Sequence, residues 1–126
     1  MANLISRKSA QLDMEVEKGT TFRHKLTWKS GLEGSETPVD LTGATARMQL
    51  RPTITSASIL HEMTTENGGI ELGGALGTVD LLIIDIDSTA FNWKKAAYSL
   101  EVVMANTDIV TLIRGTVVAY DETTRV

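Results

Sequence analysis

Apolar and polar residues alternate in short runs along this chain, and turn-forming residues interrupt the runs about every ten positions. Residues 98–104 place Tyr, Leu, Val and Met at every second position, and residues 21–28 do the same with Phe, His, Leu and Trp. Successive side chains on a strand face opposite sides of a sheet, so this period of two indicates half-buried strands. Long amphipathic helices are not indicated, and the pattern predicts an all-β fold.

The alternation predicts seven to eight mostly antiparallel strands. They are expected at about residues 12–17, 21–28, 44–51, 59–64, 70–72, 78–86, 97–104 and 109–120. Pro52 is expected to end the third of these, because proline cannot donate to a ladder. The last two strands are expected to pair as a hairpin through the turn at residues 106–108. Strands of this number and length favour a single β-sandwich over a barrel.

Four less regular features complete the predicted domain. Residues 1–10 are expected to form a flexible N-terminal arm on a sandwich of residues 11–126. Residues 29–40 are polar and rich in Gly and Ser, and are expected to form a long exposed loop. One short helical turn is expected near residues 88–93, capped by an Asp and a Ser. Gly115, inside the last strand, indicates a bulge.

Composition narrows the class of protein. The chain has 126 residues, enough for one domain with a real core. It has no cysteine, which excludes disulfides and thiolate metal sites. Twelve Lys and Arg against 16 Asp and Glu give a formal net charge of −4, which argues against nucleic acid as a partner. Neither a membrane span nor a secretory signal is expected from the sequence.

Two acidic patterns suggest chemistry, but each has a simpler interpretation. Residues 82–89 resemble the first motif of the haloacid-dehalogenase phosphatases, in which the first Asp (here Asp85) attacks phosphorus and the second (here Asp87) is an acid and base. That family has a doubly wound α/β domain, and the sequence pattern of this chain does not predict one. Asp80 with the same two residues could form a Ca²⁺ site. Solvated carboxylates are favoured in both cases.

Other candidate groups also favour structural roles. His24 lies on the apolar face of its predicted strand, and His61 has no evident second ligand. The Gly-rich residues 73–77 precede no helix that could present its N-terminus to a phosphate, so a hairpin turn is expected. Trp93 is open to either core or contact use. We therefore predict a chain that is not an enzyme and has no catalytic, metal or cofactor-binding residues.

Residues 38–51, with the sequence Pro-Val-Asp-Leu-Thr-Gly and then an alternating strand that ends on Arg, are similar to a recurring segment of small tailed-bacteriophage structural proteins. The segment also resembles part of the N-terminal Ig-like domain of phage baseplate upper proteins. Further matching pieces follow in the family's order at residues 70–86, 88–90, 98–102 and 115–117. The resemblance covers about residues 20–120. It departs from the family pattern ahead of the Tyr98 strand, where many members have a Gly.

The resemblance implies an Ig-like sandwich that is a non-enzymatic virion component of the tail, baseplate or neck. Its partners would be other virion structural proteins, in a homo-oligomeric ring or symmetric array, with no cofactor, nucleic acid or membrane. The chain would be found in the virion, and in the host cytoplasm before assembly. A capsid decoration protein and a carbohydrate-binding β-sandwich are the alternatives.

Nine residues are candidate protein contacts. They comprise arm residues that could pair with a neighbour's sheet edge, two loop residues, two arginines on an outward strand face, and one tryptophan. They are Leu4, Ile5, Arg7, Lys8, Leu32, Glu33, Arg47, Arg51 and Trp93.

Overall fold

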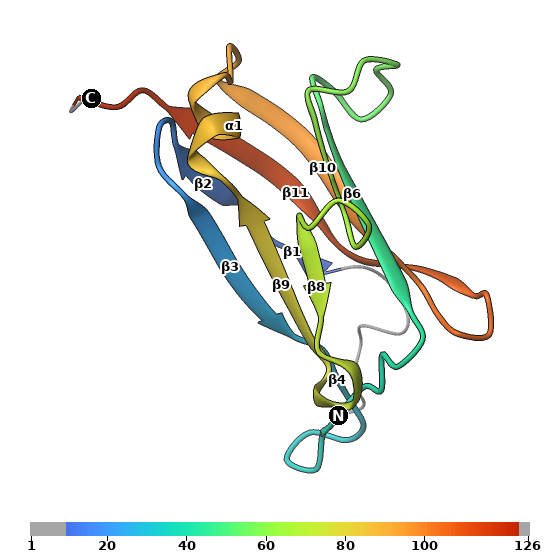
Figure 1. Ribbon diagram of the computed structural model, residues 1–126. Helices are drawn as coiled ribbons and strands as arrows, with labels where there is room; N and C mark the ends of the chain where they lie inside the picture. The colour runs from blue at the N-terminus through green and yellow to red at the C-terminus, as the bar shows by residue number, and fades with distance from the viewer. Residues whose placement is uncertain (1–9, 124–126) are drawn as a thin grey trace.

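The chain folds into two β-sheets packed face to face, in a computed structural model that describes residues 10–123 (Figure 1). Arm residues Leu4, Ile5, Arg7 and Lys8 lie outside the described residues. The elements in order are β1 (Ala10–Gln11), β2 (Met14–Glu17), β3 (Phe22–Thr27), β4 (Lys29–Ser30), β5 (Thr37–Pro38), β6 (Thr45–Arg51), β7 (His61–Thr64), β8 (Ile70–Leu72), η1 (Gly74–Leu76), β9 (Thr78–Ile83), α1 (Asp85–Thr89), β10 (Lys95–Val103) and β11 (Ile109–Tyr120).

The larger sheet has six strands, in the order β1-β11-β10-β6-β7, with β2 also pairing with β11. The smaller sheet has the order β3-β9-β8, and β4 pairs with β5 in a separate two-stranded ladder. The pairs that β1 and β2 make with β11 are parallel, and the other pairs are antiparallel. The predicted all-β sandwich and the predicted hairpin of the last two strands, now β10 and β11, are confirmed.

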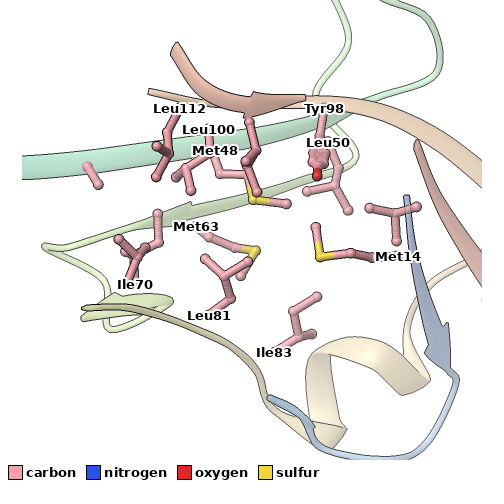
Figure 2. Close-up of a cluster of buried hydrophobic side chains, with 14 of the residues drawn as sticks. Met14, Met48, Leu50, Met63, Ile70, Leu81, Ile83, Tyr98, Leu100 and Leu112 are labelled. Atoms are coloured by element: carbon pink, nitrogen blue, oxygen red, sulfur yellow. The ribbon is translucent and has the colours of Figure 1, made fainter. Parts of the chain in front are cut away.

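The core lies between the two sheets, where alternate side chains meet (Figure 2). Met14, Met48 and Met63 project from the larger sheet, and Leu81 and Ile83 project toward them from β9. Unbranched methionines fit irregular gaps between sheets. The strict alternation of buried residues along β6 and β10 explains why the sequence pattern located these strands well.

The N-terminal strand is split in two where it runs along β11, and Gly115 lies at the break. Leu12 and Asp13 join β1 to β2, and they pass so close to Gly115 that a Cβ there would overlap the Leu12 carbonyl oxygen. The Thr116 backbone N–H donates to Asp13 Oδ1 at 3.0 Å, so a side-chain carboxylate replaces a ladder carbonyl. We call this contact of residues 12–13 with Gly115 the strand crossing.

Tyr98 fastens the strand crossing from the other side. It stands opposite Gly115 in the β10–β11 pair, and its hydroxyl donates to the Leu12 carbonyl oxygen at 2.5 Å. Because β11 lies between β10 and the N-terminal strand, the side chain must cross β11 at the glycine. Burial, and secondarily the nearby Asp13 carboxylate, raise the pKa of Tyr98 well above its usual value.

The bulge expected at Gly115 is therefore wrong. The register of the β10–β11 pair shifts between Leu100 and Glu101, opposite Leu112. Leu112 and Ile113 are both buried as a result, although they are neighbours in the chain. Glycine is required at this position because Leu12 passes so close to it. The register of the β10–β11 pair does not shift there.

The short helical turn predicted near residues 88–93 is present, but it lies slightly earlier, at Asp85–Thr89. Helix α1 begins at Asp85, and its N-cap residue Ile84 makes no side-chain cap bond. The Ser88 hydroxyl donates to the Thr20 carbonyl at 2.8 Å and accepts from the Gly19 N–H at 3.0 Å. The serine thus ties α1 to the turn between the two sheets, a long-range contact that capping rules do not describe.

Two boundaries differ from the expectation. Ala10, counted with the arm, is the first residue of β1 and is paired with Ile113. Residues 29–40, expected as an irregular loop, contain the β4–β5 ladder. We call residues 29–40 the acidic hairpin, since they hold three acidic residues and one basic residue.

Replacing Gly115 with Ala should destabilise the fold by about 1–3 kcal/mol, because the added methyl must displace the Leu12 carbonyl. Urea unfolding followed by circular dichroism measures this loss. Ser99→Ala, one ladder position away on the exposed outer face, is the matched control and should change stability by less than about 0.5 kcal/mol. Equal effects of the two substitutions would contradict the close approach.

Tyr98→Phe should cost about 1 kcal/mol at neutral pH, because the Leu12 carbonyl loses its donor. Folded Tyr98 keeps its proton to a higher pH than unfolded Tyr98, so the wild type loses stability as pH rises above about 10. The Phe variant lacks this term. The stability difference should therefore shrink as pH rises through that range in urea unfolding, and a constant difference would refute the assignment.

Candidate protein-binding site

The outer face of the larger sheet, which points away from the core, carries a groove of about 850 Å³. Its floor is the middle strand β10, whose outward side chains Ala97 and Ser99 are small. Longer side chains rise on both sides, Arg47 and Arg51 from β6 and Arg114 from β11. Small residues between two walls of long ones make the hollow. We call it the arginine groove.

Two of the three arginines already have partners inside the protein. Arg47 Nε lies 2.9 Å from Glu101 Oε1, across the β6–β10 pair. Arg51 donates through Nη1 to the Ser56 carbonyl at 2.9 Å and through Nη2 to Gln49 Oε1 at 2.5 Å. These bonds orient the guanidinium groups, and Arg51 also fixes the loop of residues 52–60.

Arg114 is different, since it is exposed and its side chain makes no hydrogen bond or ion pair within residues 10–123. It stands opposite Ser99 in the ladder, at the side of the groove away from β6. The side chains that line the groove include three arginines and one acidic residue, Glu101. In a chain of net charge −4 this face is locally positive, so it suits a carboxylate or another anion.

The outer face of the smaller sheet is a useful comparison. It carries a hollow of about 480 Å³ whose lining includes Arg23, Lys25, Glu71 and Asp80. Its charges balance, and Lys25 lies 4.0 Å from Asp80. The local charge excess therefore distinguishes the arginine groove from an ordinary outer sheet face.

The acidic hairpin projects from one end of the sandwich (Figure 1). Its tip carries Leu32, which is 65% exposed, beside the exposed Glu33. Gly31 and Gly34 have φ values of 119° and 85°, conformations that favour glycine. Exposed apolar residues scattered singly are ordinary, but one beside carboxylates at a projecting tip is a reasonable contact point.

Trp93 belongs neither to the arginine groove nor to the acidic hairpin. Its ring packs on Phe91 at a centroid distance of 4.7 Å, and Phe91 in turn meets His61 edge-on at 5.3 Å. Within the described residues, Trp93 Nε1 is buried and has no hydrogen-bond partner. Burial lowers the pKa of His61, and the charge of Asp87 partly opposes this. Of the two uses left open by the sequence, the packing favours the core.

Of the acidic residues weighed for chemistry, Asp80 lies on β9 beside Lys25, and the other two lie on α1. Asp85 and Asp87 are exposed in the first turn of this helix. Residues 10–123 contain no group of three or more His, Asp or Glu side chains placed to hold a metal ion. None of the helices in this part of the chain is long and apolar enough to cross a membrane.

The structure thus divides the five predicted contact residues that it describes among three places. Arg47 and Arg51 share the arginine groove, Leu32 and Glu33 share the hairpin tip, and Trp93 lies in the core margin. Sequence reasoning missed Arg114, although it lies on a strand whose hairpin partner was correctly predicted. The register shift opposite Leu112 changes which residues face outward, so alternation alone could not place it.

Comparison with known proteins adds no family assignment: neither the scan of protein-family models nor the search of curated proteins finds a match to this chain.

Trp93→Phe should leave the free energy of unfolding unchanged or raise it by up to about 1 kcal/mol. The smaller ring keeps the contact with Phe91 and removes a buried donor without an acceptor. Phe91→Ala, in the same cluster, should cost about 3 kcal/mol or more, because it leaves a cavity. Urea unfolding of both variants measures this, and a large loss for Trp93→Phe would show that its N–H has a partner.

Proposed function

We propose that this chain is a non-enzymatic structural component of a tailed-phage virion, in the tail, baseplate or neck, where it docks onto other virion proteins. The proposal is supported by the ordered resemblance to phage structural proteins. The observation that carries it is a rigid sandwich with two outward contact surfaces, the arginine groove and the acidic hairpin, that its own core does not need.

The pieces that carry the resemblance belong to the scaffold. The Asp40 carboxylate accepts bonds from the Thr42 hydroxyl at 2.6 Å and its N–H at 3.0 Å, and these bonds lower the pKa of Asp40. This turn leads into β6, while residues 70–86 form β8, η1, β9 and the start of α1. A resemblance in the parts that build the sandwich agrees with a shared architecture, and leaves the docking surfaces free to vary between members.

Open sheet edges add a second means of docking. Among residues 10–123, β3 pairs only with β9, so one side of this six-residue strand has no strand partner in the described part of the chain. Exposed Arg23 and Lys25 on this strand are typical of edges protected from random pairing. A specific partner strand, such as an arm from a neighbouring virion protein, could still add there.

The two alternatives make different demands on the surface. A capsid decoration protein would use the same kinds of contact on a head lattice. A carbohydrate-binding sandwich needs an exposed aromatic face beside polar groups. Tyr98 is the one aromatic residue that lines the arginine groove, and it is 5% exposed. The groove therefore favours a protein partner over a glycan.

The direct test of the proposal is to separate purified particles into heads and tails and to probe each fraction for this chain. We expect it with the tails, in a fixed ratio to the other tail proteins. Its presence with the heads would favour decoration. Absence from particles would overturn the virion assignment.

Removing residues 1–9 should weaken incorporation into particles without unfolding the sandwich, because β1 begins at Ala10. Circular dichroism and urea unfolding of the purified variant test the second part, and competition with full-length chain during assembly tests the first. Glu71→Gln, on the exposed outer side of β8, is a control that should assemble normally. Equal incorporation of the shortened and full-length chains would show that the arm is not a contact.

A further inference from the structure

We propose that the acidic hairpin of one copy docks into the arginine groove of a second copy of this chain. This proposal rests on the proposed function only in placing the contact within a virion particle. In purified protein it is a property of two surfaces described above, and it can be tested there alone.

Charge is the first argument. The acidic hairpin carries Glu33, Glu36 and Asp40 against Lys29, while the groove carries three arginines against Glu101. Glu33 and Glu36 are exposed near the tip, and Arg114 is exposed and unpaired among the described residues. Arginine binds a carboxylate through two parallel N–H bonds, so Arg114 is the natural anchor for a glutamate of the neighbour. Because the two surfaces have opposite charge, a hairpin is attracted to the groove of another copy, whereas two hairpins or two grooves repel each other.

Apolar exposure is the second argument. Leu32 at the hairpin tip is 65% exposed, and Ile54 beside the groove is 86% exposed. Neither side chain contributes to the core of its own chain. In the proposed contact each would cover the other, with the charged pairs beside them. A small apolar centre with a charged margin is the usual anatomy of a protein interface.

The third argument is that both surfaces are held in shape before contact. The base of the hairpin is tied to the sandwich, since Trp28 N–H donates to the Gly77 carbonyl at 2.8 Å and Val39 N–H donates to the Trp28 carbonyl at 2.9 Å. Across the groove, Arg51 fixes the loop that carries Ile54. Preformed surfaces lose less conformational entropy on binding, so even a small contact can be specific.

The geometry also predicts the kind of assembly. Hairpin and groove are different parts of the chain, so a docked pair still offers one free hairpin and one free groove. Such head-to-tail contacts generate a closed ring or an open filament. A contact between one hairpin and one groove is small and is expected to be weak between two isolated copies. Closure of a ring would strengthen it.

The test uses the absence of cysteine in this chain. We would mix purified Leu32→Cys with Ile54→Cys under mild oxidation and follow disulfide-linked dimers over time. The matched control mixes Leu32→Cys with Glu71→Cys, whose site is exposed on the smaller sheet. We expect the first pair to link at least about tenfold faster, since docking raises the local concentration of one thiol at the other. Equal rates would overturn the proposal.

Charge reversal makes the test specific. Arg114→Glu in the Ile54→Cys partner should slow linkage roughly tenfold, and reversing Glu33 and Glu36 to Arg in the Leu32→Cys partner should restore it. All these sites are exposed, and urea unfolding verifies that each variant folds. A linkage rate that neither charge reversal changes would overturn the proposal. Particle fractionation answers a separate question, so failure of one test leaves the other standing.

Discussion

The fold depends on one close approach, the strand crossing at Gly115. There the N-terminal strand changes from β1 to β2, and the backbone of residues 12–13 occupies the space of a missing side chain. The Asp13 carboxylate and the Tyr98 hydroxyl satisfy the backbone groups that this break would leave without partners. The bond from Tyr98 to the Leu12 carbonyl is partly buried, so its loss would leave that carbonyl without a partner at a cost in free energy. Because both segments of the N-terminal strand pair with β11, they cover the side of β11 that faces away from β10.

This arrangement separates the interior of the protein from the outer surfaces that we propose as contacts. The core is filled from the facing sides of the sheets, with methionines at its centre (Figure 2). The opposite side of the larger sheet carries small residues on β10 and arginines beside it. In the proposed function, substitutions on that outer side would alter docking, while those at the crossing would destabilise the fold. A virion component would benefit from this separation, because its docking surfaces could vary on a constant scaffold.

Local sequence patterns predicted the parts of the fold that depend on neighbours in the chain. The β10–β11 hairpin has a turn signal between two alternating runs, and both partners are close in sequence. The pairing of residues 10–17 with β11 joins segments about a hundred positions apart, and no local rule specifies its parallel direction. Ser88 was expected as a cap for a following turn, but its hydroxyl is used by the turn at Gly19 and Thr20.

The candidate site was predicted in part for the same reason. Arg47 and Arg51 were placed outward correctly because β6 alternates without interruption. Arg114 needed the register of β11, and the shift opposite Leu112 is set by packing between strands. The acidic hairpin was correctly expected to be exposed, but its β4–β5 ladder was not predicted. The base of this ladder is held by backbone bonds of Trp28, one of them to Gly77, and strands of two residues have no recognisable sequence pattern.

Native-state hydrogen exchange at the strand crossing tests the central claim most directly. Leu12 N–H donates to the Arg114 carbonyl, and Thr116 N–H donates to Asp13. If the crossing holds the sandwich together, both amides should exchange only when the whole domain unfolds, with the same protection as the amides of β10. Rapid exchange of both while β10 stays protected would show that the N-terminal strand opens by itself, and would contradict the account.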